Sequence, residues 1–202
     1  MDKTERSIEG FFPIPIHFAK HNDYKKINET VSKACYAVKK TIPNSLPEGS
    51  SNDHYSTLWA NFNLLEKEGF EDLKAFVIHE VHQYAQFLRL DIKNYPLKLS
   101  ESWVNIHGQG HSQEPHVHPN HIISGVYYVA VPESSGHLVL HSPFKYQMLS
   151  PPVLEASPHT ARTTPIKPKP GLLVIFQSFT EHSVQANMSN SDRISISFNF
   201  LM

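Results

Sequence analysis

The chain has 202 residues, of which 40% are hydrophobic and 18% are charged, which is ordinary for one soluble globular domain with a sizeable core. Its net charge is −1 with histidine neutral, so no nucleic-acid partner is indicated. The only cysteine, Cys35, excludes an internal disulfide and favours a reducing, cytoplasmic location. No stretch is apolar over the length of a membrane span, and the polar N-terminus lacks the apolar centre of a signal peptide.

Two helices are predicted in the first half of the chain. Residues 23–42 place apolar side chains at helical spacing, and Pro43 ends this helix. Residues 70–90 repeat the pattern. Between them, residues 47–53 are rich in small and polar side chains and predict a loop.

After Pro96 the apolar period changes to that of strands. Strands are predicted where β-branched and aromatic residues lie between turn residues, at 100–107, 122–131, 137–141, 163–167, 171–176, 182–187 and 193–200. Short strands at this spacing are typical of a sandwich or jelly roll. We expect a mainly β fold with flanking α, in which the N-terminal helices pack outside one sheet. Residues 1–202 are predicted to form a single domain, with 1–96 as helical support and 97–202 as the jelly-roll core.

A His-x-His pair is the strongest chemical signal. His116 and His118 lie on a segment that Pro115 and Pro119 keep extended, so their side chains point to the same side. His182 lies where a buried strand turns into the next one, and it could close a three-point metal site. Three ligands on one face, with positions left open, suit non-haem Fe(II). Zinc also accepts three histidines, but it would not explain the arginine described below.

The chain has 14 histidines, and most are not expected to bind the metal. Those predicted to lie at the surface or around the site are His107, His111, His121, His137, His141 and His159. If His118 is not a ligand, His111, His121 or Glu114 would have to complete the site.

A polar row follows on the last predicted strand. Arg193, Ser195 and Ser197 share one of its faces, and a buried polar row needs partners. A guanidinium is suited to bind a carboxylate through two parallel hydrogen bonds, to which Ser195 can add a third. Tyr127 or Tyr128 faces the interior, and a phenol there could reach the same carboxylate. The alternative is a solvent-facing strand with a surface salt bridge. Together with the histidines, the row suggests an acidic cosubstrate of the 2-oxoglutarate type.

These residues resemble the 2-oxoglutarate/Fe(II)-dependent dioxygenase superfamily, in the prolyl-hydroxylase-like branch with its small oxygenases. The matching stretches are HVHPNHIISGVYYVAVP at 116–132, GHL at 136–138 and PGLLVIFQSFTEHSVQANMSNSDRISISFN at 170–199. They cover about the C-terminal half of the chain. The resemblance implies a double-stranded β-helix fold.

The resemblance also implies metal ligands. His116 and His182 match the metal histidines of the family. The chain departs from the family at His118, where a carboxylate in a His-x-Asp pair is usual. A histidine there would make a three-histidine site, which some iron dioxygenases use.

The resemblance further implies a cosubstrate pocket. Arg193 matches the residue that binds the distal carboxylate of 2-oxoglutarate, with Ser195 and Tyr128 as helpers. Trp103 and Asn105 lie on the strand that often lines this pocket in the family.

The expected function is therefore that of an Fe(II)- and 2-oxoglutarate-dependent dioxygenase, a hydroxylase that uses dioxygen on an unidentified small-molecule or peptide substrate. Two alternatives are a cupin-like metalloenzyme without 2-oxoglutarate, in which Arg193 would bind the substrate, and a non-catalytic metal-binding jelly-roll module. Oxygen uptake coupled to succinate formation separates the first function from both. No membrane partner is indicated, and the oligomeric state is left open.

Overall fold

The computed structural model describes residues 6–8, 12–47, 54–61, 63–144, 151–157 and 159–202. Helices α1 (Tyr24–Thr41) and α2 (Glu71–Phe87) confirm the two predicted helices, and a short 3-10 helix, η1 (Leu64–Glu66), precedes α2. The predicted loop at 47–53 lies outside the described residues except for its first residue. No helix in the described ranges is long and apolar enough to cross a membrane.

Every predicted strand is present. In chain order the described strands are β1 (His17–Lys20), β2 (Tyr55–Ser56), β3 (Lys98–His107), β4 (Gln113–His116), β5 (Ile123–Ala130), β6 (Leu138–His141), β7 (Thr163–Ile166), β8 (Leu172–Gln177), β9 (His182–Val184) and β10 (Arg193–Leu201). The sequence analysis missed β1, β2 and β4, whose two to four residues contain no run of β-branched and aromatic side chains. It also made β9 too long.

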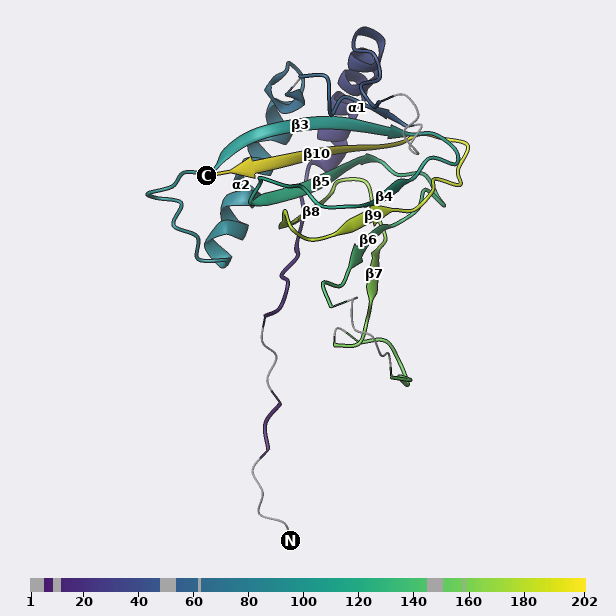
Figure 1. Cartoon of the computed structure of the whole chain (residues 1–202). Coiled ribbons are helices and arrows are strands. Elements are labelled where there is room, and N and C mark those ends of the chain that lie inside the picture. Colours follow the sequence, from purple (N-terminus) through teal and green to yellow (C-terminus); the bar gives the residue numbers. More distant parts are fainter. Residues whose placement is uncertain (1–5, 9–11, 48–53, 62, 145–150, 158) are drawn as a thin grey trace.

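The strands form two antiparallel sheets (Figure 1). The larger has the order β1-β8-β5-β10-β3-β2, and the smaller has the order β4-β9-β6-β7. The neighbours of each strand are mostly distant in the sequence, as in a jelly roll. This confirms the predicted fold class.

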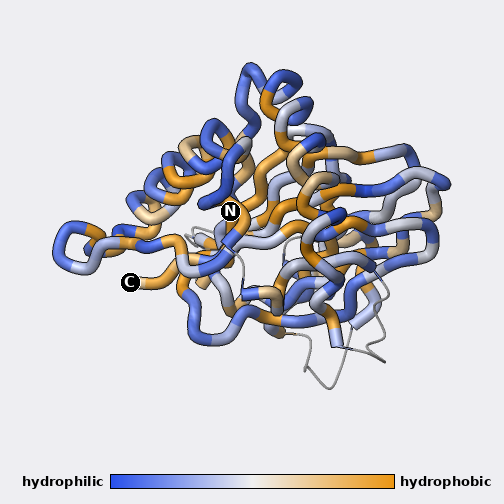
Figure 2. The backbone as a smooth tube through the Cα atoms, turned by 90° about the horizontal axis from the view of Figure 1, so that it is seen from above, coloured by the Kyte–Doolittle hydropathy of each residue, from blue (hydrophilic) through white to orange (hydrophobic). Residues whose placement is uncertain are grey.

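The outer face of the larger sheet carries the main hydrophobic core. Side chains alternate along β10, so Ile194, Ile196 and Phe198 share this face. They belong to one buried cluster with Val31 of α1, Leu73 of α2 and other apolar residues of both helices. In Figure 2 the strands beside the helices are largely hydrophobic, whereas the peripheral loops are hydrophilic. The larger sheet is therefore buried on this side by apolar packing.

The inner face of the larger sheet packs against the smaller sheet. Its buried apolar residues, Val126, Tyr128, Val174 and Phe176, form a second cluster with Leu138 and with partly buried residues of the smaller sheet. By the same alternation, the polar row of Arg193, Ser195 and Ser197 lies on this inner face. The fold thus directs polar side chains into the space between the sheets.

Candidate active site

A cavity of about 710 Å³ lies between the two sheets. The site residues predicted from the sequence all line it: His116, His118, His182, Arg193, Ser195, Tyr128 and Asn105. Trp103 lines it as well. The fold therefore brings the predicted metal ligands and the predicted cosubstrate residues into one space.

Three histidines meet on one wall of this cavity. His116 ends β4 and lies opposite His182 of β9 in the strand register, and the backbone N–H of His118 donates to Ser178 O at 3.0 Å. One ring nitrogen from each histidine lies within 4.8 Å of the other two. This spacing is suited to a single metal ion bound by three imidazoles.

Hydrogen bonds fix which nitrogen of each ring faces the cavity. Nδ1 of His116 lies 2.7 Å from Glu114 O, and Nδ1 of His182 lies 2.9 Å from Thr180 O. Because a carbonyl oxygen only accepts, both Nδ1 atoms must carry the proton. Nδ1 of His118 lies 2.5 Å from Asn199 Oδ1 and is held in the same way. In their neutral form all three rings thus leave Nε2 free to bind a metal.

The surroundings keep these imidazoles neutral. Burial lowers the pKa of His116, lowers that of His118 to about 4 and lowers that of His182 well below its usual value. The ring of Phe176 packs 4.7 Å from the ring of His182, and Trp103 lies 5.7 Å from His118, between centroids. Neutral imidazole is the form that binds metal.

Arg193 lies in the same cavity with an unbalanced charge. It is 1% exposed, and its Nη1 donates to Ser135 O at 3.3 Å. Among the described residues it forms no ion pair, and its Nε has no hydrogen-bond partner. The turn that presents Ser135 requires Gly136, because a Cβ there would lie 2.3 Å from Gln185 O. A buried, unpaired guanidinium is a binding position for an anion.

The other predicted cosubstrate residues surround this arginine. Ser195 is 2% exposed and pairs in register with Asn105 of β3 and Tyr128 of β5. The Tyr128 ring lies 5.9 Å from the guanidinium carbon, and burial raises the pKa of its phenol to about 12, so it stays a donor. The Asn105 side chain is already bonded to His54 and Ser197. Its Nδ2 has a second N–H and Asn105 lines the cavity, so its contact with a cosubstrate stays a prediction.

A stacked histidine pair lies beside Arg193. The rings of His54 and His107 are 4.1 Å apart between centroids and 9° from parallel, and His107 faces Arg193 across the β3–β10 register. Nδ1 of His54 and both ring nitrogens of His107 have no partner among the described residues. Burial lowers the pKa of His54 to about 4 and that of His107 well below its usual value. Both rings are neutral. Nε2 of His54 donates to Asn105 Oδ1, so its Nδ1 can only accept, and His107 is the ring of the pair that can donate to a ligand at Arg193 without adding charge.

The histidine pair should make the metal-free protein sensitive to acid. The pKa of His54 is about 4 in the fold, against an ordinary value of 6.5, so below pH 6.5 the unfolded chain binds more protons and stability falls until pH reaches about 4. At pH 5 the loss for His54 is on the order of 2 kcal/mol. Urea unfolding at pH 7 and pH 5, with chelator present, should show a smaller loss for His54→Phe than for the wild type. The exposed control His159→Gln should behave as the wild type; equal losses for all three proteins would contradict the prediction.

The alternative ligands of the sequence analysis lie elsewhere. His111 Nδ1 accepts the backbone N–H of Gly108 at 3.1 Å and braces a turn. His121 Nε2 lies 3.3 Å from Glu101 Oε1. Glu114 is exposed, and its backbone carbonyl, rather than its carboxylate, contacts His116. The metal-binding group that the described residues form contains none of the three.

The sequence analysis missed two parts of the site. Glu101 and Asn199 lie at the end of the same alternating rows as Asn105 and Ser197, so extending the period-two pattern by one step would have found them. His107 was predicted to lie at the surface or around the site, and its burial beside Arg193 was not foreseen. His54 has no local signal, because a two-residue strand brings it to the site.

Sequence comparison supports the same chemistry. Residues 101–199 match the family model described as "Putative 2OG-Fe(II) oxygenase". These residues belong to the 2OG-Fe(II) oxygenases. The matched region runs from β3 to β10 and contains all three histidines and Arg193. A search of curated proteins found no match.

Solved structures share the fold of the oxygenase at low identity. A prolyl-4-hydroxylase from Pseudomonas putida is 13% identical, with a TM-score of 0.66 and 94% of each chain covered. A Trichoplax adhaerens prolyl hydroxylase, in complex with a hypoxia-inducible-factor peptide fragment, is 13% identical, with a TM-score of 0.60 over 91% of this chain and 83% of that one. HygX from Streptomyces hygroscopicus, with nickel and 2-oxoglutarate bound, is 12% identical, with a TM-score of 0.60 over 93% and 82%.

The residues of the oxygenase fit the groups that its family uses. Three neutral imidazoles with free Nε2 atoms suit a divalent metal. The orphaned Nε of buried Arg193 suits a carboxylate in the same cavity. Fe(II) and 2-oxoglutarate therefore match the donor sets on both sides of the cavity.

Proposed function

We propose that His116, His118 and His182 hold Fe(II) through their Nε2 atoms in an Fe(II)- and 2-oxoglutarate-dependent hydroxylase. The observation that carries the proposal is the presence of the histidine cluster and the unpaired buried arginine in one cavity. A structural zinc site would not explain why Arg193 is buried without an ion pair to any described residue. A cupin-like enzyme without 2-oxoglutarate would have to bind the anionic group of its substrate at Arg193, deep between the sheets.

Arg193 would bind the distal carboxylate of 2-oxoglutarate, with Ser195 and Tyr128 as further donors. This role is supported by the burial of all three side chains and by the unpaired guanidinium nitrogen. The neutral pair of His54 and His107 closes the side of the pocket beside Arg193. Neutral His107, whose ring nitrogens have no partner among the described residues, can donate a hydrogen bond to the carboxylate without adding a second positive charge.

Iron with 2-oxoglutarate bound would supply the activation of dioxygen and the oxidation of a substrate C–H bond. The chain's own residues bind and orient the cosubstrate and shield the metal site from water. Arg193 sets the position of the cosubstrate through two-point hydrogen bonding. Trp103 and Phe176 pack against the histidines and exclude water from them.

The substrate would be a small molecule or a peptide that reaches the remaining part of the cavity. The peptide complex of the Trichoplax prolyl hydroxylase makes a peptide one candidate class. A single domain over residues 1–202 is part of the proposal, because one buried cluster joins both halves of the chain. So is a cytoplasmic location, which only the free, buried Cys35 supports.

The function is tested by titrating 2-oxoglutarate into the Fe(II)-loaded protein under nitrogen and recording the metal-to-ligand absorption band. Admission of dioxygen should then produce succinate even without substrate. The control is the same protein loaded with zinc, which should give neither signal. Succinate formation that does not depend on iron, or iron loading without 2-oxoglutarate binding, would contradict the proposal.

His118 is the ligand at which this chain departs from its relatives. His118→Asp restores the common His-x-Asp arrangement, so we expect it to retain iron. His118→Ala should lose most of its iron, because two protein ligands rarely hold this metal. Metal content after dialysis against a mild chelator measures both. Near-stoichiometric iron in His118→Ala would remove His118 from the site.

A further inference from the structure

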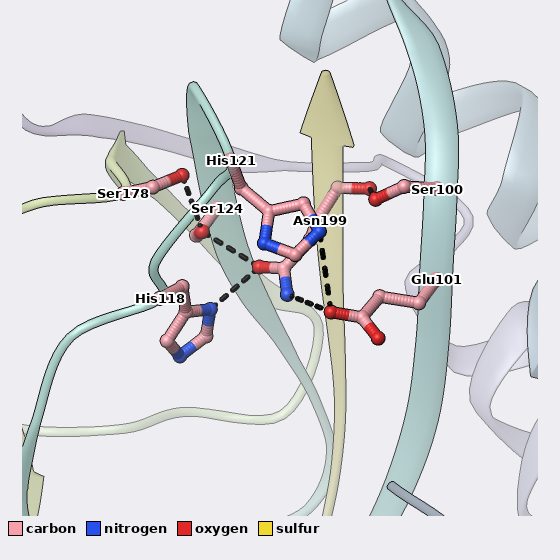
Figure 3. Close-up of polar contacts among 7 residues, drawn as sticks. All are labelled: Ser100, Glu101, His118, His121, Ser124, Ser178 and Asn199. Atoms are coloured by element: carbon pink, nitrogen blue, oxygen red, sulfur yellow. Dashed lines mark hydrogen bonds and ion pairs between the residues drawn. The ribbon is translucent and has the colours of Figure 1, made fainter. Parts of the chain in front are cut away.

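A polar network extends from the Nδ1 side of His118 (Figure 3). At its centre is Asn199 of β10, which is 2% exposed. Its Oδ1 accepts from His118 Nδ1 at 2.5 Å and from Ser124 Oγ at 2.6 Å. Its Nδ2 donates to Glu101 Oε1 of β3 at 2.7 Å. Both ends of the amide are therefore in use.

The carboxylate determines the direction of this network. A carboxylate only accepts hydrogen bonds, so the amide NH₂ of Asn199 must face Glu101 and the amide oxygen must face His118. An amide oxygen also only accepts, so His118 must carry its proton on Nδ1. Its Nε2 is then the nitrogen left for the metal. Glu101 thus controls the tautomer of His118 through Asn199, without touching it.

Glu101 also carries a charge that the three histidines lack. Neutral imidazoles leave a divalent ion without any anionic protein ligand, whereas a His-x-Asp pair supplies one. Among the described residues that line the cavity, Glu101 is the sole carboxylate. Its distance to Asn199 is 2.7 Å, against 3.3 Å to His121. The shorter contact, to Asn199, connects Glu101 to His118 of the histidine cluster. The longer contact, to His121, connects it to the segment after β4.

We propose that Glu101 is a positioning residue of the metal centre, which orients His118 through Asn199 and passes the effect of its negative charge to the metal through this hydrogen-bonded histidine. Outer carboxylates that act through a ligating histidine commonly change metal affinity about 10- to 100-fold. The inference rests on the proposed role of His118 as a ligand. Ligation by His118 alone does not require Glu101, nor does it require that the amide oxygen of Asn199 face His118.

The test is Co(II) binding to the metal-free full chain, by competition with a chelator and by the visible absorption of the bound ion. Glu101→Gln keeps the size of the side chain but removes its charge and lets either end face Asn199. We expect it to weaken Co(II) binding about 10-fold. The matched control His121→Gln removes the other partner of Glu101 and should stay within about twofold of the wild type, well below the loss expected for an outer carboxylate.

The His118→Asp background separates this role from a general effect of charge or stability. An aspartate at 118 has no N–H to donate to Asn199, so adding Glu101→Gln should then change Co(II) affinity by less than about twofold, because the outer carboxylate no longer acts through a histidine. A tenfold loss in this background as well would overturn the proposal. So would wild-type affinity in Glu101→Gln, or an equal loss in His121→Gln.

Imidazole ¹H–¹⁵N spectra of the metal-free wild type give a second measurement that needs no variant. His118 should be protonated on Nδ1, and protonation on Nε2 would overturn the proposal. Failure of the ligand assignment is recognised separately: His118→Ala would then bind Co(II) as tightly as the wild type. If His118→Ala loses Co(II) and Glu101→Gln does not, only the inference on Glu101 fails.

Discussion

Replacing His182 with alanine should abolish tight iron binding. His182 is the most buried of the three histidines, at 5% exposed, and lies directly opposite His116 in the strand pairing. Its removal leaves two imidazoles and a gap on the side of Phe176. We expect metal affinity to fall by more than about 100-fold, beyond the upper end of what loss of an outer partner causes.

Metal content of His182→Ala after dialysis against a mild chelator measures this effect. His111→Ala is the matched control, because the His111 side chain accepts from the backbone N–H of Gly108 and lies outside the group of three histidines. The control should keep its iron. Full iron occupancy in His182→Ala would take His182 out of the site.

Replacing Arg193 with alanine should weaken 2-oxoglutarate binding while metal binding survives. Each charge-assisted hydrogen bond contributes roughly 1.5–3 kcal/mol, and about 1.4 kcal/mol corresponds to tenfold in affinity. Loss of a two-point contact therefore predicts a decrease on the order of 10- to 100-fold or more. Titration of the metal-to-ligand absorption band under nitrogen measures it. Unchanged affinity would favour a metalloenzyme that does not use this cosubstrate.

The melting temperature of Arg193→Met, measured without metal, tests separately whether Arg193 serves binding or stability. The wild-type guanidinium is buried without an ion pair among the described residues, which costs folding free energy. A methionine fills similar space without that cost, so the metal-free variant should melt at an equal or higher temperature than the wild type. A lower melting temperature would mean that Arg193 is mainly structural.

The two predicted effects separate the two sides of the cavity. His182 lies on the smaller sheet and Arg193 on the larger one, and each variant should affect one binding event directly. Because 2-oxoglutarate binds the metal as well as the arginine in the proposed function, loss of the metal should also remove cosubstrate binding. Loss of the arginine should not remove the metal. This asymmetry is expected of a cosubstrate that bridges the sheets.

The alternation of side chains along strands determined much of the site from the sequence alone. It placed Arg193, Ser195 and Ser197 on one face, and the same rule extends to Asn199 and Glu101. The same alternation, continued in the extended chain beyond the end of β4, predicts that His116 and His118 point to one side, and their rings lie 5.3 Å apart between centroids. These predictions needed only local backbone geometry, which is why the bounds of the long strands β3, β5, β8 and β10 agree with the sequence analysis to within about two residues.

Strand ends were less predictable because tertiary contacts set them. The sequence extends β9 to residue 187, but β9 ends at Val184. Beyond it, the Asn187 backbone N–H donates to His111 O and its side chain donates to His107 O. These bonds draw the chain away from the smaller sheet and toward the turn after β3. The local sequence does not show whether residues 185–187 pair within the smaller sheet or bond to the turn after β3.

Only the tertiary structure decided which distant residues meet. The sequence could name His116 and His182 as ligands, but the β4–β9 register is what sets them opposite each other. His54 stacks on His107 because β2 pairs with the end of β3. Glu101 is connected to His118 through Asn199 because β3 and β10 are neighbours. Local sequence sets the direction of each side chain through the pleat of its strand. The order of strands, and so the partner that each side chain meets, depends on long-range pairing and on burial of both faces of the larger sheet.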